Sequence, residues 1–133
     1  MNFKGKDLWA LILGGSSGFG LATAKKLSSH GINICIIHRD TRGAMSQIQK
    51  EFDSIKDHET NFMSFNLDAL SADGRAKALN EFQEKVGAGK IKPLLHSIAF
   101  GNLKPLVAKK TVDKIPNEEE FFLEEEDFAR TVY

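Results

Sequence analysis

Cysteine is nearly absent from this 133-residue sequence, whose single cysteine, Cys35, lies inside the apolar segment INICII. A disulfide within the chain is therefore impossible, and we expect a buried, reduced thiol. Because no disulfide requires an oxidising compartment, we expect a cytoplasmic location.

An excess of either charge and long hydrophobic runs are also missing. The 18 basic and 18 acidic residues give a formal net charge of zero, so the chain has no general electrostatic attraction for nucleic acid or an anionic membrane. The longest apolar runs, residues 8–13 and 34–37, are too short to cross a bilayer, and the start, MNFKGKDLW, contains no stretch of signal-peptide length. The composition, 41% apolar and 27% charged, is that of a soluble globular domain. We expect a small molecule as its partner, and neither nucleic acid nor a membrane.

Short apolar runs alternate with helical periodicity along the first hundred residues. Strands are expected at residues 8–13, 32–38 and 61–67, with a fourth, buried strand opening at residue 93. Apolar residues at steps of three and four predict helices between the strands, one over residues 19–30, one through Met45, Ile48, Phe52 and Ile55, and one through Ala76, Leu79, Phe82 and Val86. This order predicts an α/β fold, a Rossmann-type doubly wound parallel sheet that is incomplete. Right-handed crossovers would place the fourth strand on the far side of the first from the second.

The first predicted strand runs directly into the glycine-rich segment GGSSGFG. No lysine follows its last glycine, so it is not the phosphate-binding loop of nucleoside triphosphatases, and Thr23 replaces the third glycine of G-x-G-x-x-G. The order present is G-x-x-x-G-x-G, on Gly14, Gly18 and Gly20.

Each glycine has a distinct expected role in binding a dinucleotide. Gly14 lets the chain turn off the strand, Gly18 leaves room for a pyrophosphate, and Gly20 lets the new helix lie close to the sheet. Backbone N–H groups at the helix N-terminus would face the anion. Ser16 and Ser17 add hydroxyl donors, and Phe19 would shield an edge of the cofactor. The alternative is a glycine-rich turn that serves packing alone.

The residues at the end of the second predicted strand indicate which cofactor binds. The segment HRD, residues 38–40, follows Gly20 by about 20 positions, where an acidic residue binds the ribose of NAD and an arginine binds the 2′-phosphate of NADP. We expect NADP, because Arg39 has the forked, permanently charged group that suits a phosphate. Asp40 keeps NAD as the alternative, and a surface pair of Arg39 with Asp40 would leave neither residue for the cofactor.

These motifs resemble those of the short-chain dehydrogenases/reductases over the first hundred residues. The glycine motif is theirs, Arg39 matches the arginine of their NADP-dependent members, and Asn66–Leu70 matches the segment bordering the adenine, where the family usually has aspartate in place of Asn66. The segment LLHSIAFG is similar to a strand of the enoyl-acyl-carrier-protein reductases, in which the main chain matching Ser97 to Ala99 runs along the ribose and nicotinamide. The cofactor-binding residues expected from motif and resemblance are Gly14, Ser16, Ser17, Gly18, Phe19, Gly20, His38, Arg39, Asn66, Leu67, Ser97, Ile98 and Ala99.

The resemblance implies hydride transfer from the nicotinamide to a carbonyl or enoyl substrate, with a tyrosine and a lysine as catalytic pair. The only tyrosine, Tyr133, has nothing after it, so no catalytic residue is assigned. We therefore expect the front portion of a longer NADP(H)-dependent oxidoreductase, in which residues 1–101 form the dinucleotide-binding βαβαβαβ unit and residues 102–133 a charged loop and the start of the next helix of the same domain. The chain alone would be inactive.

Other interpretations remain open. A non-catalytic NADP-sensing module, or an inactive fragment, would use the same loop, and an interaction domain would need no nucleotide. The substrate is unknown, with a fatty-acyl thioester suggested only by the LLHSIAFG segment. No metal site is expected, because the histidines lack ligand spacing and His96 is expected to be packed within or beside its strand. An unpaired apolar fourth strand would favour a homo-oligomer.

Overall fold

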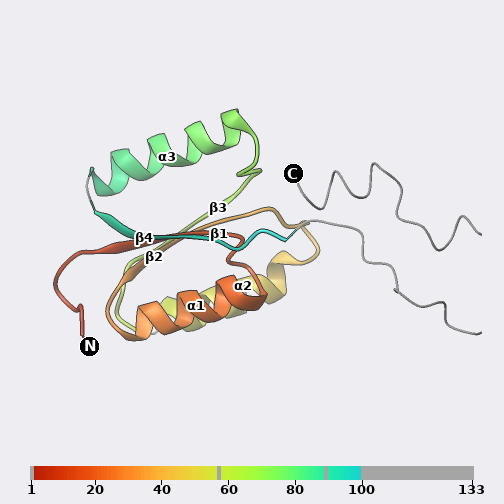
Figure 1. The fold of residues 1–133 in the computed structure, drawn as a ribbon. Helices are drawn as coiled ribbons and strands as arrows, with labels where there is room; N and C mark the ends of the chain where they lie inside the picture. The colour runs from red at the N-terminus through yellow and green to blue at the C-terminus, as the bar shows by residue number, and fades with distance from the viewer. Residues whose placement is uncertain (1, 57, 89, 100–133) are drawn as a thin grey trace, which may run out of the picture. The chain divides into compact units, whose positions relative to one another are not determined.

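A computed structural model describes residues 2–56, 58–88 and 90–99 of the chain, as four strands that alternate with three helices (Figure 1). The elements are β1 (Trp9–Leu13), α1 (Gly18–Ser29), β2 (Asn33–His38), α2 (Met45–Lys56), β3 (Phe62–Asn66), α3 (Ala72–Val86) and β4 (Ile91–His96). The predicted alternation is confirmed, and every described element lies within one compact unit, Met1–Ile98. The predictions for residues 102–133, and Tyr133 with them, fall outside the described residues.

All pairings in the sheet are parallel, in the order β3-β2-β1-β4. This order confirms the incomplete, doubly wound sheet expected from right-handed crossovers. Leu13 is in register with Ile37 and with His96, while His38 is in register with Asn66. The segments that follow all four strands therefore leave from one edge of the sheet, where ligands bind in folds of this kind.

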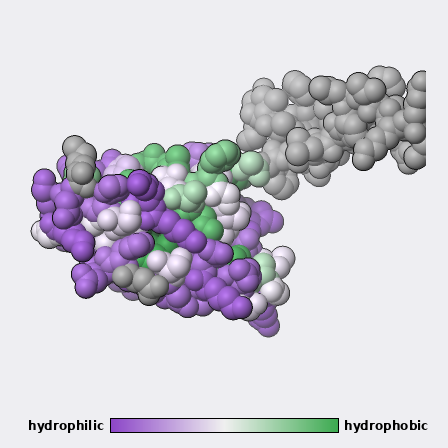
Figure 2. All heavy atoms as spheres, turned by 90° about the horizontal axis from the view of Figure 1, so that it is seen from below, coloured by the Kyte–Doolittle hydropathy of each residue, from purple (hydrophilic) through white to green (hydrophobic). Residues whose placement is uncertain are grey.

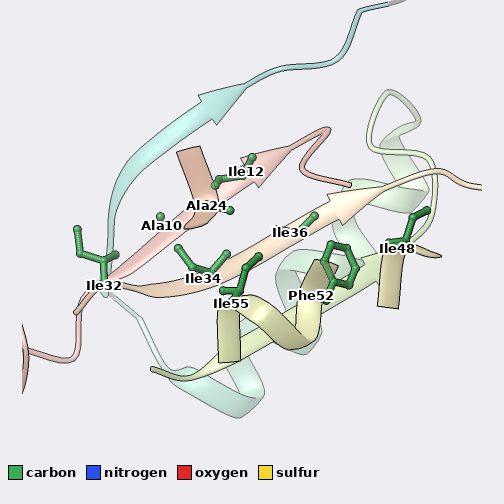
Figure 3. Packing of buried hydrophobic residues seen from close by; sticks show 9 residues of the cluster. All are labelled: Ala10, Ile12, Ala24, Ile32, Ile34, Ile36, Ile48, Phe52 and Ile55. Atoms are coloured by element: carbon green, nitrogen blue, oxygen red, sulfur yellow. The ribbon is translucent and has the colours of Figure 1, made fainter. Parts of the chain in front are cut away.

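Helices cover both faces of the sheet, with α1 and α2 on one side and α3 on the other (Figure 1). Alternate strand residues such as Ile12 and Ile36 meet Phe52 and Ile55 of α2 in one apolar cluster (Figure 3). The residues between them, including Leu11 and Cys35, form a second cluster under α3. Two covered faces explain why the β1 and β2 sequences are apolar without interruption rather than alternating.

The outer surface of the layer formed by α1 and α2 is mainly hydrophilic, with apolar residues showing through its middle (Figure 2). The two helices are joined there by Lys25, whose Nζ donates to Oε2 of Glu51 at 2.5 Å. This bond holds the pKa of the Glu51 carboxyl below its usual value. Within the described ranges, no helix has both the length and the apolar character that crossing a membrane requires.

The prediction of which α3 residues face the sheet is wrong in part. Phe82 is buried as expected, but Ala76 is exposed and Leu79 is 45% exposed, and Ala78 is buried in their place. The face is set by Phe82, whose ring packs edge-on against Trp9 with centroids 5.4 Å apart. Ala78 lies one helical turn before Phe82 and so shares its direction.

The fourth strand is not buried as predicted. Leu94 is in register with Leu11 yet is 66% exposed, so α3 does not extend over it. The burial of β4, which among the described strands pairs with β1 alone, alternates between half-buried and exposed residues.

Candidate functional site

The loop after β1 lies in close contact with both the end of β4 and the start of α1. Gly14 has a φ of +82°, its N–H donates to the Ile37 carbonyl at 2.8 Å, and a Cβ on it would lie 2.6 Å from the Ser97 oxygen. A Cβ on Gly20 would lie 2.1 Å from the Gly14 oxygen. The fold itself therefore requires glycine at these two positions. The absence of a Cβ there lets the N-terminus of α1 lie against the loop.

Gly18 differs from these two glycines, because the space beside it is open. Its φ is +56° and nothing lies within 4 Å of the position of a Cβ. Ser17, the N-cap residue of α1, makes no side-chain cap hydrogen bond, and the first turn contains no acidic residue. In α3, by contrast, the N-cap Ser71 accepts from the Gly74 N–H at 3.0 Å. The first N–H groups of α1 are thus left without the side-chain oxygen that caps α3.

A cavity of about 380 Å³ adjoins this helix start. It reaches from the glycine loop to the segment between β2 and α2 and to α2 itself, and its lining comprises Ser16, Ser17, Gly18, Leu21, Asp40, Ala44, Gln47, Ile48 and Glu51. Phe19, next to Gly18, is 89% exposed. The cavity therefore lies between the residues that begin α1 and Asp40, which follows β2.

The residues that end β2 point in two directions. The His38 side chain is only 1% exposed, packs edge-on against Phe52, and has Nδ1 2.8 Å from Oδ2 of Asp40. Arg39 points away from this pair, with Nη1 3.2 Å from Oδ2 of Asp68. The surface pair of Arg39 with Asp40 that the sequence left open is not formed. Arg39 and Asp40 instead have separate partners, as alternation along an extended chain requires.

Asn66, at the end of β3, is bonded to the main chain of Asp40. Its Oδ1 accepts from the Asp40 N–H at 3.0 Å, and its Nδ2 donates to the Asp40 carbonyl at 3.0 Å. Leu67 adds a main-chain bond, its N–H donating to the His38 carbonyl at 2.8 Å, and its side chain packs against the cluster under α3. The ends of β2 and β3 are thus joined by both main-chain and side-chain bonds.

The end of β4 lies beside the glycine loop. The Ser97 N–H donates to the Leu13 carbonyl at 2.8 Å, and Ile98 packs against the cluster under α3. Ala99 is exposed. His96 is also exposed, contrary to the packed position expected for it, because it lies at the end of β4, which is the edge strand among the strands that the structure describes.

The predicted residues therefore form two groups on one sheet edge, the glycine loop with Ser97 and the ends of β2 and β3. The cavity is lined by residues of the first group and by Asp40, the neighbour of Arg39, and none of the predicted residues of the second group lines it. Asp68 was missed as a member of the second group. The register of His38 with Asn66 places the residues after both strands side by side, so the acidic residue in NLD was the available signal. Over the described ranges, no three histidine, cysteine, aspartate or glutamate side chains gather as metal ligands would.

Comparison with known proteins relates this geometry to one family. A family model described as short chain dehydrogenase matches residues 8–115. Among solved structures, a dehydrogenase/reductase from Sinorhizobium meliloti is 23% identical with a TM-score of 0.64, over 84% of this chain and 42% of its own. An NAD⁺-bound xylitol dehydrogenase is 22% identical with a TM-score of 0.64, over 98% and 42%. A metagenomic short-chain oxidoreductase in complex with NADP is 23% identical with a TM-score of 0.56, over 66% and 37%.

These similarities cover less than half of each solved structure, and at such identities they show the shared fold alone. A search of curated proteins finds no match.

Proposed function

The chain belongs to the short-chain dehydrogenase family, and we propose that it supplies the NADP(H)-binding portion of an oxidoreductase of that family. Residues 1–101 would be the binding unit and residues 102–133 a continuation of the same domain. The whole protein would act on a carbonyl or enoyl substrate, and its location would be the cytoplasm. No residue of this chain is proposed as catalytic.

The observation that carries this proposal is the uncapped start of α1. Gly18 opens onto free space, and Ser17 leaves the first N–H groups of the helix without a side-chain acceptor. Such a helix start binds a pyrophosphate through backbone N–H groups and the helix dipole. Ser16 and Ser17, which line the adjoining cavity, would donate hydroxyl hydrogen bonds to the same phosphates. The residues present thus fit a dinucleotide, which would supply a hydride from its nicotinamide ring.

The remaining expected contacts lie where an extended dinucleotide would run along this edge of the sheet. Ser97 and Ile98 follow β4 beside Gly14 and would line the nicotinamide side. Leu67 follows β3 and would border the adenine, and the exposed Phe19 would cover one edge of the cofactor. His38 is buried, so it would act by holding Asp40 rather than by touching the cofactor.

Arg39 favours NADP over NAD. Its guanidinium is exposed at the end of β2 and offers a fork of N–H donors to a 2′-phosphate. One observation favours NAD as a second candidate, because Asp40 lines the cavity and its carboxylate would accept from a ribose diol. His38 occupies one Asp40 oxygen, which reduces the acceptor capacity left for such a diol.

A titration of the 133-residue chain with NADPH and NADH, followed by cofactor fluorescence, tests the proposal. We expect saturable binding of both cofactors with tighter binding of NADPH. In Gly18→Asp a carboxylate would face the pyrophosphate, so binding should fall by at least tenfold. Gly5→Asp is the matched control, because Gly5 also has a positive φ, +80°, and open space. Equal binding by wild type and Gly18→Asp, or no binding by the folded wild type, would overturn the proposal.

A further inference from the structure

We propose that Asn66 is a positioning residue that holds the segment carrying Arg39 and Asp40, and that it thereby sets how strongly the site distinguishes NADPH from NADH. This inference rests on the proposed function. It gives Asn66 a different role from the adenine contact expected from its place after β3.

The Asn66 side chain bonds to its own protein through both its oxygen and its nitrogen. Its carboxamide makes a paired contact with the Asp40 main chain, with Oδ1 accepting from the N–H and Nδ2 donating to the carbonyl, both at 3.0 Å. Nδ2 also lies 3.5 Å from Sδ of Met45, the first residue of α2. Both donor hydrogens of Nδ2 therefore have acceptors, and only the second lone pair of Oδ1 is left for a contact with an adenine.

The paired contact fixes the backbone on one side of Arg39, and β3 fixes it on the other. The His38 carbonyl accepts from Leu67, and both main-chain groups of Asp40 are held by Asn66. Arg39 therefore stands between two anchored peptide units. The Arg39 guanidinium therefore has a defined position, next to the Asp68 carboxylate. A forked donor distinguishes a phosphate from a hydroxyl only if it is held in position, since an unrestrained side chain loses conformational freedom on binding.

Only asparagine, among residues of this size, completes the paired contact. An aspartate would still accept from the Asp40 N–H but would have no hydrogen for the Asp40 carbonyl. It would also add a negative charge next to Arg39, where a 2′-phosphate would bind. The side chain is exposed at the sheet edge, so replacing it leaves no buried cavity.

The test compares the ratio of dissociation constants for NADH and NADPH in wild type and Asn66→Asp. We expect Asn66→Asp to reduce the ratio by about tenfold, the effect of losing one hydrogen bond near a charged group. Asn80→Asp, the same chemical change at an exposed position of α3 away from the site, should leave the ratio unchanged. In an Arg39→Ala background, the effect of Asn66→Asp on the ratio should shrink to the part caused by the added negative charge alone. An equal change in affinity for both nucleotides would point to an adenine contact and would overturn the inference, as would an unchanged ratio.

Amide hydrogen exchange at Asp40 tests the same contact without nucleotide. We expect exchange of this amide to be at least tenfold faster in Asn66→Ala than in wild type, with the Leu67 amide unaffected, because Asn66 Oδ1 is the acceptor for Asp40. Unchanged exchange would overturn the inference. A wild-type chain that binds both nucleotides equally would instead overturn the proposed NADP preference, and the exchange result would then still decide whether Asn66 holds the segment.

Discussion

Arg39 and Asp68 lie 29 residues apart in the sequence and face each other across the ends of β2 and β3, with Nη1 3.2 Å from Oδ2. Both side chains are exposed to solvent, at 74% and 39%, so the pair contributes at most about 1 kcal/mol to stability. A charge-assisted bond to a phosphate is worth more, about 1.5–3 kcal/mol. The contact therefore orients the Arg39 guanidinium without preventing its transfer to a 2′-phosphate.

Asp68→Asn is expected to strengthen NADPH binding about threefold and leave NADH binding unchanged. The substitution removes the charge that competes for Arg39, an effect of the size of a surface ion pair. It keeps Oδ1, which accepts from the Leu70 N–H at 2.8 Å, so the turn should be preserved. Parallel fluorescence titrations with the two cofactors measure the effect. Weaker NADPH binding would show that Asp68 is needed to orient the guanidinium.

Arg39→Ala is expected to weaken NADPH binding at least tenfold, with a change of less than about twofold for NADH. The reason is the loss of the forked donor that would bind the 2′-phosphate. Arg42→Ala, which removes an arginine from the same segment, is the matched control. Isothermal titration calorimetry with each cofactor provides the measurement. An equal loss for both would contradict the assigned preference for NADP.

Replacing the two N-cap serines by alanine should affect different properties, the stability of the fold for Ser71 and the cofactor affinity for Ser17. Ser71→Ala should reduce the free energy of unfolding by about 1 kcal/mol, because it removes the acceptor for the Gly74 N–H. Ser17→Ala removes no cap bond, so stability should change by less than about 0.5 kcal/mol while cofactor affinity falls. Urea denaturation and NADPH titration of both variants separate the two effects. Equal destabilisation would mean that Ser17 also caps its helix in solution.

Gly20→Ala should destabilise the fold by at least about 2 kcal/mol, because its Cβ would lie 2.1 Å from the Gly14 oxygen and the backbone would have to move. Gly43→Ala is the control, since nothing lies within 4 Å of that position and its φ is not positive. This control should be neutral, or more stable by up to about 1 kcal/mol through reduced freedom of the unfolded chain. Thermal unfolding of both variants in the absence of nucleotide gives the comparison.

Cys35 should resist thiol reagents until the protein unfolds. Burial raises the pKa of its thiol from 9.0 to about 12, so the native protein holds almost no thiolate at pH 8. Because the unfolded thiol ionises first, stability from this group is complete below pH 9 and is lost as the pH rises toward 12. Cys35→Ala should make the stability profile flatter over that interval. Rapid labelling of the folded protein at pH 8 would contradict the buried assignment.

The order of elements and the sheet topology followed from the sequence, because buried parallel strands read as uninterrupted apolar runs and crossovers have one hand. The glycine spacing likewise identified the loop and the family. The inward face of α3 did not follow, since Leu79 and Ala78 fit a helical stripe almost equally well, and only the packing of Phe82 on Trp9 distinguishes them.

By itself, then, the sequence determined that Gly14, Gly18 and Gly20 join a buried strand to a helix and that Arg39 and Asp40 directly follow the next strand, because these properties depend on residues close together in the chain. Only the tertiary structure decided that the Asp40 main chain binds Asn66 while Arg39 faces Asp68. These partnerships depend on the register of β2 with β3. That register pairs His38 with Asn66, which lie far apart in the sequence, and a shift of one residue would turn every side chain of the strand to the other face of the sheet.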